Sequence, residues 1–385
     1  MEDVLSNTVS KLKSKDYSSV TVVLGNESCD LDSAISSLVY AIFLHWQYQK
    51  IHCGVCTRTS DDVKHEIFVP LLDVDREDFE LKTEVAYSLK EVGITKELLV
   101  FRDDLNLQEL VQTVTTRVIL VDHHVLCKKY EYLAPYVTEI IDHRPLDRSG
   151  WKYKEDTRST IEVVGSCCTL VGQRIKDLSA LLSKDMEFFN AYPVCARLLH
   201  SVILLDTVNF SKEVNKATPQ DEEIVLFLEN VIKPNDCHLE RKTLVDRLVA
   251  ARCDVSALTA AQLLRKDVKV IADILVPSFP ILVEEFLAKP DAIPALDEAL
   301  TQRQCSVGVL LGMKLGAQLQ RDVAVYARND PAITESLARG LQQWTRPSLG
   351  LSQSPAIDCL YFTQSNLAAS RKQYLPALTH FLSQQ

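Results

Sequence analysis

Two carboxylates stand close together at a turn that follows a predicted strand. The strand covers residues 20–24, a helix is predicted over 32–47, and the run 25–33 that joins them reads GNESCDLDS. Asp30 and Asp32 repel each other unless a cation or a proton neutralises one charge. The pair therefore predicts a metal-binding turn, with an exposed helix cap as the more common alternative for this motif alone.

Two later strands, predicted over 117–121 and 137–141, end in an acidic residue followed by imidazole or guanidinium groups. The two endings are Asp122-His123-His124 and Asp142-His143-Arg144. Asp206 follows one more apolar segment, a helix predicted over 190–205. Ligand sites in parallel α/β sheets lie at the carboxyl ends of strands, so we expect these endings to converge with the carboxylate pair of the first turn. Carboxylates and imidazoles together suit Mn, Mg, Co or Zn, and the set predicts a site for two metal ions.

The elements that position these residues follow an α/β pattern. In the first half, short β-branched runs alternate with amphipathic stretches, which predicts a parallel sheet flanked by helices. The strands are predicted over 20–24, 98–101, 117–121 and 137–141. At 385 residues the chain exceeds what one hydrophobic core usually holds, so we expect two domains, over 1–250 and 251–385. Strands predicted over 306–311 and 322–326 indicate that the second, smaller domain is also α/β.

Two helix starts lie between these groups of motifs. Gly165 with Ser166 begins one predicted helix, and the run 218–221 begins another that ends before Pro234. For Gly165 and Ser166, a substrate-positioning role and close helix packing are both open.

The composition fits a soluble globular protein. Hydrophobic residues make up 46% of the chain, and no stretch is apolar for long enough to cross a membrane. A net charge of -10 argues against a protein that coats nucleic acid but allows a small anionic phosphate substrate. Eleven cysteines indicate a reducing compartment, for which we expect the cytoplasm, with the nucleus and the mitochondrion left open. Cys53 and Cys56 form a C-x-x-C pair to which we assign no role.

Seven segments together resemble the DHH phosphoesterase superfamily, and within it the Prune branch of exopolyphosphatases, which is related to family II inorganic pyrophosphatases. They occur in the same order and cover nearly the whole chain, at 25–33, 118–125, 140–145, 163–171, 201–221, 254–269 and 369–378. The resemblance implies a parallel-sheet DHH domain with a binuclear metal site. It also implies a smaller α/β DHHA2 domain that closes over the substrate, with the active site in the interdomain cleft.

The resemblance further implies a role for each site residue. Asp122 bridges two divalent cations (Mn, Mg or Co), Asp30 completes the first metal site, and the second is completed by Asp32, His143 and Asp206. Asp30 and Asp122 are the residues implied as catalytic. Substrate contacts are implied for Asn26, Arg144, Lys269, Arg371 and Lys372. His123 and His124 are candidates either for substrate contact or for a supporting contact to the metal ligands. The implied reaction is hydrolysis of a phosphoanhydride bond in short-chain polyphosphate, or in pyrophosphate, by water activated between two metals.

Three residues depart from the pyrophosphatase pattern and agree with the Prune-like branch. Asn26 stands where pyrophosphatases have a metal-ligating His, which predicts a weaker or different first metal site, because an amide is a poorer donor. His124 stands in place of an Asn, and Arg144 in place of a second His. Our hypothesis is that the added positive charge and hydrogen-bonding capacity favour short polyphosphates over pyrophosphate.

Two other functions stay open. A cyclic-nucleotide phosphodiesterase would use the same metal chemistry, although the sequence shows no evident base-binding platform. Alternatively, the chain would be a weakly active regulator that binds nucleoside diphosphate kinase, as the resemblance to Prune-like proteins implies. That contact is usually placed in a C-terminal extension, and the chain ends at Gln385, soon after the segment 369–378, which argues against binding by this route.

Overall fold

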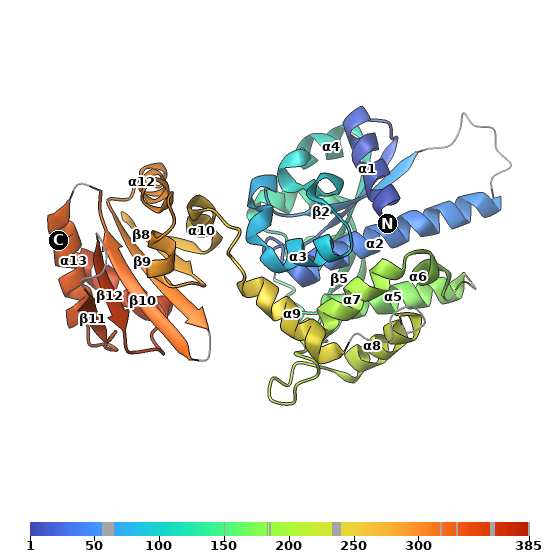
Figure 1. The fold of residues 1–385 in the computed structure, drawn as a ribbon. Helices are drawn as coiled ribbons and strands as arrows, with labels where there is room; N and C mark the ends of the chain where they lie inside the picture. The colour runs from blue at the N-terminus through green and yellow to red at the C-terminus, as the bar shows by residue number, and fades with distance from the viewer. Residues whose placement is uncertain are drawn as a thin grey trace. The chain divides into compact units, whose positions relative to one another are not determined.

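The computed structural model describes residues 1–55, 65–149, 151–182, 184, 186–232, 240–315, 318–328, 330–354 and 359–383, with the backbone alone at 52–55. The Cys53 side chain and Cys56 lie outside these residues. The chain forms two compact units, Met1–Arg252 and Cys253–Gln385, coloured from blue to yellow and from yellow to red in Figure 1. Within the described part of the chain, no helix is long and apolar enough to cross a membrane.

A six-stranded parallel sheet organises the first unit. Its strands are β1 (Ser19–Leu24), β2 (Glu66–Leu72), β3 (Val100–Phe101), β4 (Thr115–Val121), β5 (Val137–Asp142) and β6 (Arg158–Ile161). Their order in the sheet is β3-β2-β1-β4-β5-β6, and every neighbouring pair is parallel. The chain adds strands on one side of β1 and then continues from β4 on the other side. Such a reversal leaves a crevice at the carboxyl ends of the two strands where it occurs, here β1 and β4.

Helices cover both faces of this sheet. One face packs against α2 (Leu31–Val55), α5 (Cys167–Leu181), α7 (Pro193–Asp206) and α8 (Pro219–Ile232), which Figure 1 shows gathered together. The opposite face packs against α4 (Leu107–Thr113) and the 3-10 segment η4 (Lys128–Tyr136). Helix α2 is apolar around most of its circumference because it is enclosed between the sheet and α5 with α7. Further helices and 3-10 turns are α1 (Glu2–Ser14), α3 (Thr83–Glu91), α6 (Glu187–Ala191), α9 (Arg241–Cys253), η1 (Arg76–Leu81), η2 (Lys96–Leu98) and η3 (Arg102–Asp104).

The predicted α/β class with a parallel sheet is confirmed. The strands predicted over 20–24, 117–121 and 137–141 are β1, β4 and β5. The strand predicted over 98–101 is wrong in its first half, because Lys96–Leu98 forms the 3-10 turn η2 and only Val100–Phe101 pairs with β2. Strand β2 had not been predicted.

The second unit contains another six-stranded sheet, which is largely antiparallel. Its strands are β7 (Val268–Ile271), β8 (Ile274–Phe279), β9 (Val307–Leu315), β10 (Leu319–Tyr326), β11 (Leu351–Ser354) and β12 (Leu360–Gln364), in the order β11-β12-β10-β9-β8-β7. Its helices are α10 (Ala260–Lys266), α11 (Val283–Leu287), α12 (Ala292–Gln302), α13 (Pro331–Gln343) and α14 (Arg371–Leu382). The strands predicted over 306–311 and 322–326 are confirmed as β9 and β10, so this is the smaller α/β unit that the sequence predicted.

A buried charged cluster ties β5 to its neighbours. Glu139 of β5 is fully buried, and its Oε2 accepts hydrogen bonds from the Tyr40 hydroxyl and from Arg158, both at 2.9 Å. Arg174 of α5 lies 3.0 Å from the other carboxylate oxygen. A buried carboxylate is tolerated as an anion only while such partners remain. The cluster therefore fixes the strand that ends at Asp142 to α2, α5 and β6.

We expect Glu139→Gln to lower the free energy of unfolding by about 2–3 kcal/mol, because the two guanidinium groups lose a buried counter-charge. The matched control is Lys152→Gln, which breaks an exposed ion pair with Glu131 of 3.2 Å and is expected to change that free energy by less than about 1 kcal/mol. Urea unfolding followed by circular dichroism measures both. Equal effects of the two variants would contradict the structural importance given to Glu139.

Candidate metal centre

The turn after β1 leaves no room for a side chain at Gly25. A Cβ atom there would lie 2.5 Å from Ser33 Oγ, which accepts a hydrogen bond from the Asn26 N–H at 2.6 Å. Asp30 caps α2, because its Oδ1 accepts from the Ser33 N–H at 3.1 Å. Its Oδ2 accepts from the Ser28 hydroxyl at 3.0 Å. The helix cap that the sequence left as an alternative is therefore present at Asp30, and it uses one of the two carboxylate oxygens.

Asp122, the residue after β4, has a left-handed backbone conformation with a φ of 61°. This conformation costs an L-residue about 1 kcal/mol, although Asp tolerates it better than most. In it, the Asp122 carboxylate meets the turn after β1, where Asn26 Nδ2 donates to Asp122 Oδ2 at 2.7 Å. The other oxygen, Oδ1, is buried and has no hydrogen-bond partner among the described residues. A buried carboxylate oxygen without a donor is available to a cation.

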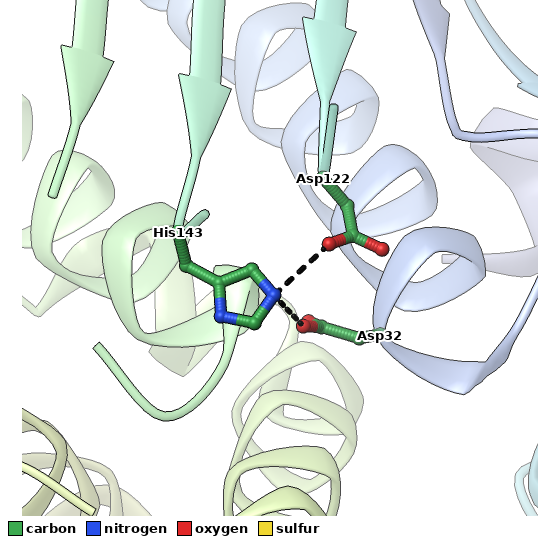
Figure 2. Close-up of side chains that lie close together, drawn as sticks. All are labelled: Asp32, Asp122 and His143. Atoms are coloured by element: carbon green, nitrogen blue, oxygen red, sulfur yellow. Dashed lines mark ion pairs between the residues drawn. The ribbon is translucent and has the colours of Figure 1, made fainter. Parts of the chain in front are cut away.

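Three of the predicted metal ligands come together in one cluster. Figure 2 shows His143 directed at the carboxylates of Asp122 and Asp32. His143 Nε2 lies 3.2 Å from Asp122 Oδ1 and 3.7 Å from Asp32 Oδ2, and the ligand atoms of the three residues lie within 4.8 Å of one another. The other ring nitrogen, Nδ1, donates to the Val164 carbonyl at 3.0 Å. This bond orients the ring with Nε2 toward the cluster, as in metal-binding histidines whose second nitrogen is tied to the protein.

Asp32 is held by the first turn of α5. Its Oδ1 accepts hydrogen bonds from the Ser166 hydroxyl and the Cys168 N–H, both at 2.9 Å, and its Oδ2 accepts from the Cys167 N–H at 2.7 Å. The partial positive charge of a helix N-terminus stabilises a carboxylate at this place. Because each carboxylate oxygen has about two acceptor positions, Oδ2 keeps one on the side of His143.

Asp206, the last residue of α7, adds a fourth carboxylate. Burial and the charge of Asp32 raise the pKa of Asp206 well above its usual range, and the charge of Asp30 adds to this rise. Burial and Asp32 likewise raise the pKa of Asp122 to about 7. Asp206 Oδ2 is buried and, like Asp122 Oδ1, has no hydrogen-bond partner in the described part of the chain. Mutually repelling carboxylates with buried, unpartnered oxygens fit divalent cations.

A cavity of about 250 Å³ lies beside this cluster. Its wall includes Arg144 and His123, two of the predicted substrate contacts. Arg144 is half exposed, and its Nη2 lies 3.9 Å from Asp122 Oδ1. His123 donates from Nδ1 to the Val121 carbonyl at 2.9 Å, and burial lowers its pKa, so the ring is neutral at pH 7. Arg144 and His123 are therefore placed where an anionic ligand would meet them.

Two other predicted substrate contacts are engaged with the site's own residues. Asn26 Oδ1 accepts from the Ser28 N–H at 2.9 Å while its Nδ2 is bonded to Asp122. His124 is hydrogen-bonded through Nδ1 to Asp142, and its Nε2 accepts from the Asp147 N–H at 2.8 Å. With both ring nitrogens used, buried His124 is not positioned to contact a substrate. Of the two roles that the sequence left open for His124, this geometry favours the support of Asp142.

Comparison with known proteins decides the family. Residues 246–381 match the model of the DHHA2 domain. The whole chain is 33% identical to exopolyphosphatase PRUNE1 of Rattus norvegicus, covering 79% of that protein, and 32% identical to exopolyphosphatase PRUNE1 of Homo sapiens, covering 80%. The chain belongs to the Prune-type exopolyphosphatase family. The resemblance drawn from the seven sequence segments is confirmed, and the DHHA2 match coincides with the second unit together with most of α9.

In this Prune-type chain, the remaining predicted substrate contacts lie in the second unit. Lys269 is exposed on β7, and Arg371 begins α14, where its Nη2 donates to Asp267 Oδ1 at 2.6 Å. Because Asp267 directly precedes β7, this bond brings the first turn of α14 to the strand that carries Lys269. Lys372 is exposed on the same turn. Two cations at a helix N-terminus add to the positive end of the helix dipole, so this turn favours an anion.

Asp73 is a buried carboxylate beside the cluster, and the sequence reasoning missed it. It follows β2 and is 2% exposed, and its Oδ1 accepts from the Tyr130 hydroxyl at 2.7 Å and from Lys129 at 3.2 Å. It lines the same cavity as Arg144. The signal was present in the apolar run 67–72 that ends in a carboxylate, the pattern that had identified Asp122.

We expect the affinity of the chain for Mn²⁺ to rise with pH. Burial alone lowers the pKa of His143, but the adjacent Asp122 and the charge of Asp32 outweigh it and raise the pKa to about 9. Below that pH the metal-free ring holds a proton that a cation must displace, so affinity should rise up to about tenfold per pH unit for each displaced proton. Isothermal titration calorimetry in buffers of different ionisation enthalpy measures both the affinity and the proton release. A pH-independent affinity with no proton release would contradict the arrangement around His143.

Proposed function

We propose that this chain is a metal-dependent phosphohydrolase that cleaves phosphoanhydride bonds of short-chain inorganic polyphosphate. The observation that carries the proposal is the cluster of Asp32, Asp122 and His143, in which Asp122 Oδ1 is buried without a hydrogen-bond partner in the described part of the chain. Relatives that align with the whole chain are named exopolyphosphatases, which supports the same substrate class.

Five residues are proposed to hold two divalent cations, Mn or Mg. Asp122 would contribute to both cation positions, Asp30 to the first, and Asp32, His143 and Asp206 to the second. When bound, such a pair lowers the pKa of a coordinated water and neutralises charge on phosphoryl oxygens. The protein's part is to present an oxygen or nitrogen atom with a free electron pair from each residue, as Nε2 of His143 and Oδ1 of Asp122 are presented.

The cavity beside the cluster is proposed to receive the terminal phosphoryl groups. Arg144 on its wall has a guanidinium group, which can donate two parallel hydrogen bonds to phosphate oxygens. His123 is neutral, so it can contact the same group without adding a charge that would vary with pH. These two residues orient the phosphate for displacement.

The second unit is proposed to bind the anionic tail of the substrate. Its first α14 turn carries Arg371 and Lys372 beside the helix N-terminus, and Lys269 stands on the adjoining strand β7. A longer polyphosphate has more negative charge for these cations than pyrophosphate has. The proposal therefore gives the second unit a larger share of binding as the substrate lengthens.

The first test compares the wild type with Asp122→Ala. Phosphate release is measured from pyrophosphate, tripolyphosphate, longer polyphosphate and cyclic AMP, with Mg²⁺ or Mn²⁺. We expect release from tripolyphosphate in the wild type and a loss of at least about 1,000-fold in the variant, because the bridging carboxylate is removed. Glu131→Ala, at an exposed carboxylate, is the control and should keep wild-type turnover.

The same assay separates this function from its rivals. Phosphate diester cleavage of cyclic AMP that depends on Asp122, without release from polyphosphates, would replace the proposal with a cyclic-nucleotide phosphodiesterase. A wild type that shows no Asp122-dependent turnover on any substrate would favour a binding or regulatory protein.

A second test concerns Arg144 and substrate preference. We expect Arg144→His to raise pyrophosphate turnover relative to tripolyphosphate turnover, because it removes a permanent charge and a bidentate donor from the cavity wall. Lys152→His, on the surface of the same unit, is the control for introducing an imidazole. The ratio of kcat/KM for the two substrates is the readout, and an unchanged ratio in Arg144→His would remove the argument.

A further inference from the structure

Asp221 is a carboxylate to which the proposed mechanism assigns no part. It is fully buried in the first turn of α8. Its Oδ2 accepts from the N–H and the hydroxyl of Thr218, both at 2.7 Å, which resembles a helix capping box. Its Oδ1 accepts from the Thr169 hydroxyl at 2.6 Å. A further donor, the Gly165 N–H, lies 2.9 Å from Oδ2 and 3.1 Å from Oδ1, and it lies outside the helix that Asp221 caps.

The bond from Gly165 connects Asp221 to the metal cluster through a single peptide group. The Gly165 N–H and the Val164 carbonyl are the two ends of that group, and the carbonyl accepts the His143 Nδ1–H at 3.0 Å. A negative charge at the N–H end polarises the peptide and makes the carbonyl a stronger acceptor. A stronger acceptor keeps the ring proton on Nδ1 and leaves Nε2 directed at Asp122.

The same loop also reaches Asp32. Residues 164–168 continue from this peptide into the first turn of α5, where a hydroxyl and two backbone N–H groups hold the Asp32 carboxylate. No side chain fits at Gly165, because a Cβ atom there would lie 2.6 Å from Thr207 Cγ2 and 3.0 Å from Asp221 Oδ2, so the backbone of the loop packs directly against both residues. Thr207 in turn directly follows Asp206. The position of Gly165 therefore determines the positions of the groups that donate to Asp32 and of the Val164 carbonyl that accepts from His143.

We propose that Asp221 is a positioning residue of the metal centre. It orients His143 through the peptide between Val164 and Gly165, and it orients Asp32 through the loop 164–168. The inference rests on the metal site of the proposed function, but it does not depend on which phosphate is the substrate. A capping role for α8 explains the Thr218 contacts alone, whereas the positioning role also explains the donor from Gly165.

The test is Asp221→Asn in the full chain. Asparagine keeps the size of the side chain, but it has one acceptor oxygen and turns an NH₂ group toward the backbone donors. We expect Mn²⁺ affinity, measured by isothermal titration calorimetry, to fall about 10- to 100-fold while the circular dichroism spectrum stays that of the wild type. Phosphate release should fall at low Mn²⁺ and recover at saturating Mn²⁺, because the site is loosened and its ligands are all retained.

Asp322→Asn is the matched control. Asp322 is a buried carboxylate of the second unit that accepts from the backbone N–H groups of Val283 at 2.8 Å and Glu284 at 3.1 Å, and from the Tyr361 hydroxyl at 3.0 Å. Like Asp221, Asp322 is a buried carboxylate that accepts hydrogen bonds from backbone N–H groups. In the described part of the chain, the residues that it binds do not contact a predicted metal ligand. We expect this variant to lower the thermal unfolding temperature and to bind Mn²⁺ as the wild type does.

Wild-type Mn²⁺ affinity in folded Asp221→Asn would overturn the proposal, and so would an equal loss in Asp322→Asn. If Asp221→Asn does not fold, Ser166→Ala decides, because it removes one donor from Asp32. A weaker Mn²⁺ affinity in it supports the role of the loop, and an unchanged one overturns it. A wild type that binds Mn²⁺ but releases no phosphate would contradict the proposed function alone. The Mn²⁺ affinities of the wild type and of Asp221→Asn could still be compared, so the positioning role would still be tested.

Discussion

The repulsion among four buried or half-buried carboxylates is the constraint on which the rest of the site depends. At the switch point of the sheet, between the ends of β1 and β4, burial and the charges of Asp32 and Asp30 raise the pKa values of Asp122 and Asp206. Burial makes this repulsion larger, because little water screens it. Polar groups of the fold reduce this repulsion. They are a helix N-terminus, an amide, an imidazole and a serine hydroxyl, and they lie against the carboxylates.

These neutralising groups leave part of each carboxylate available. Asn26 bonds Asp122 Oδ2 and leaves Oδ1 without a partner among the described residues. The first turn of α5 takes both acceptor positions of Asp32 Oδ1 and only one of Oδ2. The pattern is what a cation site requires, since each carboxylate is anchored by neighbouring groups and still has a free electron pair. Acidic residues on a protein surface are solvated, so buried carboxylate oxygens without a partner are not expected among them.

The sequence predicted the strands and site residues that a local pattern of apolar and charged residues indicates. It did not predict the features that depend on contacts between residues far apart in the chain. Asp122 and His143 end apolar runs, so their place at the sheet edge followed from the strands alone. Asp32 is held by donors 134 to 136 residues further along the chain, which no local pattern reveals. Strand β2 includes Pro70, whose missing N–H argues against an inner strand, and it was overlooked with the Asp73 that follows it. The sequence left two roles open for both His123 and His124, because the left-handed turn at Asp122, which sends the two adjacent rings in different directions, has no local sequence signal.

Asn26 connects this architecture to the proposed preference for polyphosphate. Its amide oxygen accepts from Ser28 and its nitrogen donates to Asp122, so in this arrangement it anchors a neighbouring ligand and is not itself a ligand. A hydrogen bond donated to a carboxylate withdraws electron density from it and weakens its hold on a cation. In the proposed mechanism, the first metal position would then have fewer protein donors than a His at residue 26 would provide, and oxygens of the substrate would complete it. We propose that this weaker position contributes to a preference for longer anionic chains, because they offer more phosphate oxygens.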